Sequence, residues 1–289
     1  MASPRPADVG PYERAGDVVR AYDRDRYIAD LFAPQAARRH LFALHGFNAE
    51  IARIRDVVSE PAIGEIRIQW WRDAILNGAG GGHPVATALE RTIAAFNLPK
   101  DAFERLLDAR IFDLYDDVLP TLNDLEGYAG ETSSAVIQLG ALILADGDPG
   151  TSGAAGHAGV AVALTGLLRA LPRNAARGQP YLPEAMVNSR AVDLATVRAG
   201  RTTPELLSLL TDLRTIARQH LLQAELELAH VDPVVAPAFL PLVLVRPYLD
   251  RMDAEGYDPF HPPEIAPWKR QWIVWRAVRT NALFGGRQR

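Results

Sequence analysis

The sequence contains no cysteine among its 289 residues. A disulfide bond, a thiolate nucleophile and a cysteine-ligated zinc or iron–sulfur site are therefore excluded. The absence of disulfides is typical of a chain in a reducing compartment. We expect a cytoplasmic location, with contact at the inner membrane as an alternative.

The chain also lacks an excess of positive charge and a long apolar run. Its 31 Lys and Arg residues against 35 Asp and Glu give a net charge of -4, which argues against nucleic acid as a partner. The apolar stretch at residues 158–168 is far shorter than the ~20 residues that span a bilayer. Four prolines interrupt the more apolar stretch at residues 231–249. The polar start of the chain resembles no secretory signal, and we predict no transmembrane helix.

What the chain does contain is enough apolar material for a full core. Hydrophobic residues make up 48% and charged residues 23%, so disorder is expected only at the ends. The Pro-rich residues 1–12 are predicted to be a flexible segment. No internal repeat and no long linker divides the rest, and we predict one domain over residues 13–285.

Apolar residues recur at helical spacing along almost the whole chain, and proline or glycine separates the segments. Thr121 with Asp124 forms a capping-box pattern, and Thr203-Pro204-Glu205 is a strong helix start. No segment shows sustained two-residue alternation. We therefore predict an all-α fold with almost no sheet. The predicted helices cover residues 22–32, 35–58, 64–76, 84–96, 99–115, 121–145, 154–173, 203–230, 237–254 and 267–283.

Two of these helices carry recognisable sequences. LFALHGFNAEIARIRD, at residues 41–56, resembles the first signature of the squalene/phytoene synthase family. LTGLLRALPRNAARGQPYLP, at residues 164–183, resembles the second. The stretches at residues 69–89 and 106–117 fit the segments between them. The resemblance implies the isoprenoid synthase fold, a single helical bundle around a central cavity lined by both signature helices.

The family joins two prenyl diphosphates, and pyrophosphate leaves with several negative charges. Mg²⁺ must neutralise these charges. Magnesium prefers oxygen ligands, so each signature of the family presents aspartates about one helical turn apart. The resemblance therefore implies where such carboxylates should stand in this chain.

Most of these carboxylates are missing. The first acidic pattern falls on Ala52, Arg53 and Asp56, and only Asp56 is an acid. The second falls on Ala170, Arg173 and Asn174, which include no acid. A guanidinium group repels a divalent cation that a carboxylate would attract. We therefore expect no bound metal and no cofactor. Pro172 stands inside the second signature, where we predict a kink or the end of the helix.

The second signature is similar to a branch of the family that includes a mitochondrial factor for the assembly of respiratory complex I (NADH:ubiquinone oxidoreductase). The resemblance implies a pseudoenzyme that acts on complex I subunits or assembly intermediates. A bound prenyl or lipid ligand and a peripheral membrane contact would fit this role. The alternative is an active phytoene or squalene synthase, a transferase of isoprenoid and carotenoid biosynthesis that uses Mg²⁺. A simple lipid carrier is a third interpretation.

Several arginines are candidates for an anion site that would grip a diphosphate or a lipid headgroup. The alternative is a solvated set that pairs with nearby acids, and for Asp56 we favour such surface pairing with Arg53 over metal binding. Candidate ligand-binding residues are Arg53, Arg169, Arg173, Arg177 and Tyr181.

The positions and roles of the tryptophan and histidine residues can also be predicted. Of the adjacent Trp70 and Trp71, we expect one in the core and one at the rim. Trp268, Trp272 and Trp275 form a stripe beside cationic residues, which favours either an anionic membrane surface or, as we prefer, packing against the body. We expect structural roles for His45 of the first signature and for His83 and His157, which stand without a second metal-type ligand one helical turn away.

Overall fold

The computed structural model describes residues 10–284, and these residues form helices without a β-strand. The prediction of an all-α fold is confirmed. Contacts between residues divide the chain into two compact units. Within the described residues, unit 1 comprises residues 10–115, 138–150 and 232–238, and unit 2 comprises residues 116–137, 151–231 and 239–284.

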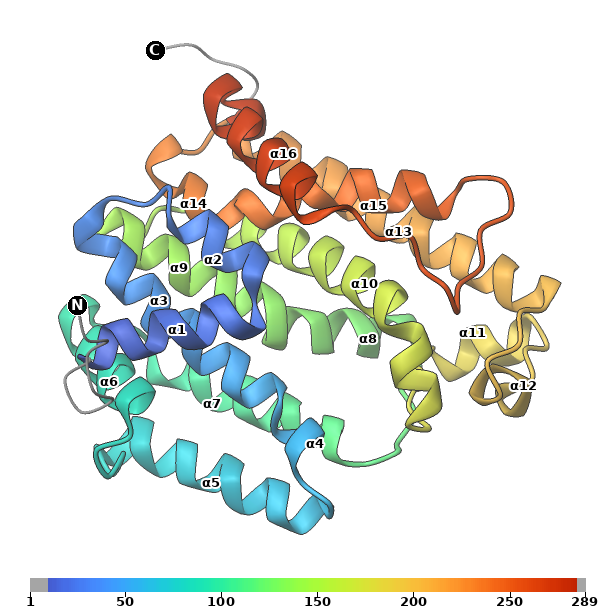
Figure 1. Ribbon diagram of the computed structural model, residues 1–289, viewed down its shortest axis with the longest axis horizontal. Helices are drawn as coiled ribbons and strands as arrows, with labels where there is room; N and C mark the ends of the chain where they lie inside the picture. Colours follow the sequence, from blue (N-terminus) through green and yellow to red (C-terminus); the bar gives the residue numbers. More distant parts are fainter. Residues whose placement is uncertain (1–9, 285–289) are drawn as a thin grey trace, which may run out of the picture. The chain divides into compact units, whose positions relative to one another are not determined.

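Unit 1 is built mainly from the N-terminal helices. In it α1 packs along α3, and both contact α6, while α5 packs on α7 (Figure 1). Phe47 of α3 joins these layers, because its ring lies 5.2 Å from that of Trp71 and 5.6 Å from that of Phe103. The elements are α1 (Pro11–Tyr22), α2 (Arg24–Asp30), α3 (Gln35–Ala52), α4 (Ile54–Val57), α5 (Pro61–Asn77), α6 (Pro84–Phe96), α7 (Lys100–Ile111) and η2 (Phe112–Leu114).

Unit 2 is organised around α10 and α13, which lie side by side and both contact α15 (Figure 1). Its elements are α8 (Leu122–Ala129), η3 (Gly130–Ser134), α10 (Ser152–Ala176), α11 (Glu184–Ser189), α12 (Leu194–Arg198), α13 (Pro204–Leu228), η5 (Leu240–Leu244), α15 (Val245–Met252), α16 (Pro267–Thr280) and η6 (Ala282–Phe284). Three further elements contain or adjoin a boundary between the units: α9 (Ala135–Ala145), η4 (Pro233–Val235) and α14 (Ala236–Phe239).

Local side-chain chemistry fixes several helix starts where the sequence predicts them. Thr121 and Asp124 form the predicted capping box at α8. The hydroxyl of Thr203 accepts a hydrogen bond from the Leu206 N–H at 3.2 Å, and Pro204 follows as the first helical residue of α13. These caps satisfy N–H groups that have no partner within the helix.

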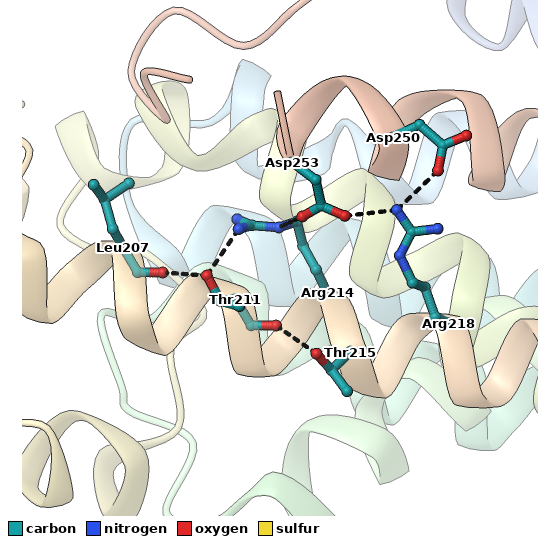
Figure 2. Close-up of polar contacts among 7 residues, drawn as sticks. All are labelled: Leu207, Thr211, Arg214, Thr215, Arg218, Asp250 and Asp253. Atoms are coloured by element: carbon teal, nitrogen blue, oxygen red, sulfur yellow. Dashed lines mark hydrogen bonds and ion pairs between the residues drawn. The ribbon is translucent and has the colours of Figure 1, made fainter. Parts of the chain in front are cut away.

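An ionic network holds α15 against α13 in unit 2 (Figure 2). Arg214 Nε donates to Asp253 Oδ1 at 2.6 Å, and its Nη2 donates to the Thr211 hydroxyl at 2.8 Å. Arg218 Nη2 donates to Asp253 Oδ2 at 2.7 Å and to Asp250 Oδ1 at 2.9 Å. Burial opposes ionisation of Asp253, but the two arginines outweigh it, and the pKa of Asp253 is lowered.

Several segments differ from the prediction, and the helices α1, α11 and α12 fall outside the predicted ranges. The helix predicted at residues 35–58 breaks at Arg53, which caps α3 before the short α4. The helix predicted at residues 121–145 contains a π-helical turn, Gly130–Ser134. Of the two outcomes predicted at Pro172, a kink or the end of the helix, the end is wrong, since α10 continues to Ala176. Proline removes only one backbone hydrogen bond, and buried Leu171 and Ala175 on either side pack the last turn in place.

The described residues begin and end inside the predicted segments. Residues 1–9 of the predicted flexible segment and residue 285 lie outside the described residues, while Pro11 and Tyr12 lie in the first turn of α1. Within residues 10–284, the segments Ser152–Ala176 and Pro233–Met252 are long and apolar enough to cross a membrane by length and composition. More than half of each apolar window is buried in the structure, as in the core helix of a soluble protein.

Candidate functional site

The first signature occupies the C-terminal end of α3 in unit 1. Ala52 is the last residue of the helix, Arg53 caps it, and the exposed Asp56 follows in α4. The guanidinium of Arg53 lies 3.3 Å from the centre of the Tyr22 ring. An aromatic face attracts a cation, so Tyr22 holds the arginine that stands in a metal-ligand position of the family.

Glu50 lies one turn before Arg53 and is the carboxylate whose chemistry is most altered in this region. Burial raises the pKa of Glu50 to about 7, although the charge of Arg53 opposes the shift. The Nε2 atom of His83 lies 3.6 Å from Glu50 Oε2, and burial lowers the pKa of His83. Both shifts favour the neutral side chains near neutral pH.

Trp70 and Trp71 surround this histidine. The ring of Trp70 lies 5.4 Å and that of Trp71 5.6 Å from the His83 ring. Trp71 is buried and Trp70 half-buried, so the prediction of one core and one rim tryptophan is confirmed. His83 also caps α6, because its Nδ1 atom accepts from the Ala86 N–H at 3.5 Å. It thus has the structural role predicted for it.

The second signature occupies the C-terminal end of α10 in unit 2. Arg169 is half-buried, with its guanidinium 3.8 Å from the Tyr248 ring centre and its Nη2 atom 3.4 Å from Glu264 Oε1. Its buried Nε–H finds no acceptor among residues 10–284. Arg169 therefore contacts Tyr248 and Glu264 but keeps one buried N–H group that donates to no described protein atom.

The three residues predicted to stand at metal-ligand positions of this signature differ in exposure. Ala170 is half-buried, Arg173 is exposed and Asn174 is buried. The carbonyl of Asn174 accepts hydrogen bonds from the N–H groups of Arg177 and Gln179, at 3.2 and 3.0 Å, which closes the helix. Arg177 is exposed, and Arg173 lies one turn before it on the same side of the helix.

Tyr181 follows the helix in a left-handed conformation, with a φ of 55°. Its ring lies 5.6 Å from that of Tyr128. Beneath it, leucines of α8, α10 and α13 enclose an apolar cavity of about 10 Å³, which holds one water molecule at most. This small cavity of unit 2 offers no room for a lipid chain.

The helix ends explain why arginine fits at both signatures. Each signature lies at a helix C-terminus, where unpaired carbonyls leave a partial negative charge that favours a cation. A Mg²⁺ ion held by carboxylates would meet this preference, and so does a guanidinium group. Among residues 10–284 no group of three or more His, Asp or Glu side chains is placed to hold a metal ion.

Two other polar clusters involve histidines. His157 of α10 has a partner that the sequence did not reveal, because its Nδ1 atom lies 2.9 Å from that of His220 on α13. His220 Nε2 lies 3.1 Å from Glu126 on α8. His45 is buried with its Nδ1 atom 2.8 Å from Asp30, and burial raises the pKa of this aspartate.

The helix α16 presents its tryptophans to solvent. Trp268, Trp272 and Trp275 are 70%, 49% and 47% exposed, respectively. The preferred prediction, that this stripe packs on the body of the protein, is therefore wrong. Smaller residues, Val274 and Ala277, form the buried side of the helix.

The sequence also matches a known protein family over most of its length. The model of the family described as squalene/phytoene synthase matches residues 19–276. The chain belongs to the squalene/phytoene synthase family. The match includes both signatures, and the fold is therefore the isoprenoid synthase fold predicted from them.

Relatives within the family have different names. The chain is 30% identical over 249 residues to a Rattus norvegicus protein named NADH dehydrogenase (ubiquinone) complex I, assembly factor 6, covering 85% of this chain and 75% of that protein. It is 27% identical to a phytoene synthase of Thermus thermophilus, covering 90% of each.

A solved structure is similar in fold. The squalene synthase HpnC of Alicyclobacillus acidocaldarius superposes with a TM-score of 0.74 and 22% identity. The superposition covers 86% of this chain and 95% of that one.

Proposed function

We propose that this protein is a non-catalytic member of its family that assists the assembly of respiratory complex I. The observation that carries the proposal is the replacement of acids by Ala52, Arg53, Ala170, Arg173 and Asn174 at the family's metal-ligand positions. The similarity to proteins named complex I assembly factor 6 supports the same role. Its partners would be complex I subunits or assembly intermediates.

The environment of Arg53 supports the proposal physically. Its guanidinium is held on the Tyr22 ring at a helix C-terminus, where the family would place a cation-binding acid. Two unit charges ~4 Å apart interact by ~4 kcal/mol at the surface of a protein, so a fixed guanidinium opposes Mg²⁺ at that distance. We propose that the protein works without a metal or another cofactor.

We further propose a cytoplasmic protein whose arginines bind the anionic head of a prenyl or lipid ligand. The unpaired buried Nε–H of Arg169 supports an anion at the second signature. Titration calorimetry with inorganic pyrophosphate, without Mg²⁺, tests this idea. Arg169→Gln and Arg173→Gln should each weaken binding, whereas Arg190→Gln, at the residue that follows α11, should not, because Arg190 is paired with Asp212 at 2.6 Å.

A gene deletion tests the assembly role. The deletion strain should contain less assembled complex I in native gels and show lower NADH:ubiquinone oxidoreductase activity, while succinate oxidation serves as the control. A plasmid copy should restore the complex, and so should a copy carrying Asp56→Asn, because the role requires no metal. Normal complex I in the deletion strain would refute the proposal.

An active phytoene or squalene synthase is the second candidate. The exposed Asp56 and the similarity to a phytoene synthase over most of both chains favour it. Under this interpretation Mg²⁺ would be required. Loss of a carotenoid or squalene product in the deletion strain, together with normal complex I, would support the synthase.

A further inference from the structure

The outer side of α16 is an aromatic surface. Counting 100° per residue, the side chains of Trp268, Trp272 and Trp275 fall within a sector of about 60°. The buried Val274 and Ala277 lie on the opposite side of the same helix. The tryptophans thus face directly away from the core of unit 2. They are three of the five tryptophans of the whole chain.

The charge of this helix differs from that of the protein. The sequence of α16, PWKRQWIVWRAVRT, contains four cationic residues and no acid, although the whole chain has a net charge of -4. Arg279 projects into the tryptophan sector, and Lys269 and Arg276 lie along one flank. The guanidinium of Arg276 lies 5.0 Å from the Trp272 ring centre, and that of Arg279 lies 5.4 Å from that of Trp275.

A groove follows the cationic flank. It lies between α15 and α16, has a volume of about 800 Å³, and is lined by Lys269 and Arg276 together with the apolar Ile273 and Leu242. Two acids also line it, and each is already paired: Glu225 with Arg246 and Asp250 with Arg218. The anionic headgroup of a lipid would contact Lys269 and Arg276 at this flank. The apolar part of the lipid would contact Ile273 and Leu242 in the groove.

We propose that α16 docks the protein on an anionic lipid bilayer, lying in the plane of the surface with its three tryptophans in the headgroup region. Tryptophan prefers the membrane–water interface because its ring is apolar and its N–H is polar. Each cation near an anionic surface adds electrostatic attraction. The proposal is independent of the proposed function, since lipid binding and complex I assembly are measured separately.

Charge complementarity favours lipid over a second copy of this chain. Two α16 helices that met by their tryptophan faces would bring three cations of each chain together, Lys269, Arg276 and Arg279, and like charges in contact are unfavourable. An anionic bilayer neutralises these cations and accepts all three rings. An acidic partner protein would do so as well, and the experiment separates it from lipid by using vesicles alone.

Vesicle sedimentation of the purified full-length chain tests the proposal. The protein should bind vesicles of phosphatidylcholine with 30% phosphatidylglycerol about tenfold or more tightly than vesicles of phosphatidylcholine alone. High salt should release it, because salt screens the attraction. Brominated lipids should quench the tryptophan fluorescence of the bound protein, since quenching requires contact with the lipid.

Two variants locate the contact. Trp268→Ser/Trp272→Ser/Trp275→Ser should lose at least tenfold in affinity and all quenching, with Trp70 and Trp71 remaining as fluorescent reporters. The matched control, Leu222→Ser/Leu226→Ser on α13, also removes exposed apolar side chains and should bind as wild type, because these leucines are 53% and 54% exposed outside α16. Circular dichroism should show all three proteins folded, since the replaced side chains point outward.

Three results would overturn the proposal. The first is absence of wild-type binding to anionic vesicles. The second is equal binding to neutral and anionic vesicles, and the third is unchanged binding of the folded triple variant. A dimer in light scattering that disappears in the triple variant, without vesicle binding, would assign the surface to a second copy instead.

Discussion

At the scale of single residues, two glycines of α10 show how close packing restricts the sequence. A Cβ atom on Gly159 would lie 2.2 Å from Ser134 Oγ and 2.3 Å from the backbone of Ser134. A Cβ atom on Gly166 of the same helix would meet nothing within 4 Å. The π-helical turn and α10 therefore approach each other as closely as a hydrogen side chain allows.

We predict opposite effects of alanine at these two positions. Gly159→Ala should lower the free energy of unfolding by about 2 kcal/mol or more, because the backbone of η3 must move. Gly166→Ala should raise it by about 0.5–1 kcal/mol through helix propensity. Urea unfolding followed by circular dichroism measures both. A neutral Gly159→Ala would contradict the close approach of the two elements.

Glu50 makes stability depend on pH. The folded state holds the proton of Glu50 up to about pH 7, whereas the unfolded state releases it near pH 4.5. The unfolded state therefore binds fewer protons between these values, and this group's contribution to stability falls as pH rises through the window. Above about pH 7 the buried Glu50 is ionised in the folded state, and the loss of stability caused by its burial is complete.

The variant Glu50→Gln removes this penalty. Relative to wild type, we expect it to gain on the order of 1–3 kcal/mol between pH 5 and pH 8, measured as the difference in unfolding free energy. The control Glu255→Gln, at an exposed carboxylate, should show no such gain. A constant difference between wild type and Glu50→Gln at both pH values would show that Glu50 titrates normally.

At the scale of elements, α13 and α15 depend on one carboxylate. Asp253 accepts bonds from both Arg214 and Arg218, and Arg214 is only 7% exposed (Figure 2). Asp250 accepts one bond from Arg218 and is more exposed than Asp253. Removing Asp253 would leave a buried cation without its ion-pair partner.

We therefore expect the replacement of aspartate by asparagine to lower the free energy of unfolding more at position 253 than at position 250. Asp253→Asn should lower the free energy of unfolding by about 1–3 kcal/mol, and Asp250→Asn by about 0.5 kcal/mol or less. The lowered pKa of Asp253 means that its contribution is present above about pH 4 and is lost as pH falls through the folded-state value. Thermal unfolding of both variants at pH 7 tests the ranking, and equal losses would argue against the shared role of Asp253.

The elements also show what a sequence can and cannot predict. The starts of α8 and α13 were predicted well, because Thr121 and Thr203 cap neighbouring N–H groups locally. The π-helical turn was not, because the bond from Ser134 Oγ to the Gly156 carbonyl joins residues of different helices. Likewise the break at Arg53 accompanies its contact with Tyr22 on α1, which no local pattern reveals.

The orientation of α16 was predicted wrongly for a different reason. Its largest apolar residues are the tryptophans, so hydrophobicity alone assigns them to the core. The core contacts use the smaller Val274 and Ala277 instead. An amphipathic pattern identifies a helix, but it does not decide which of two apolar faces meets the protein.

At the scale of the whole molecule, family membership was readable from residues 41–56 and 164–183, and the absence of the expected acids from these two segments remains a prediction about metal binding. The partners of these residues within their units were not readable, because Tyr22, Tyr248 and Glu264 are distant in the sequence. The proposed function rests on the altered charge at two helix ends of a conventional scaffold. A fold alone does not determine function.

The central claim is that this charge prevents Mg²⁺-dependent condensation, and one assay tests it directly. The purified protein is incubated with labelled farnesyl or geranylgeranyl diphosphate, Mg²⁺ and NADPH, and both pyrophosphate release and hydrocarbon products are measured beside an active synthase. We predict neither pyrophosphate nor product above the protein-free control. Product that forms with wild type and disappears with Asp56→Ala would contradict the account.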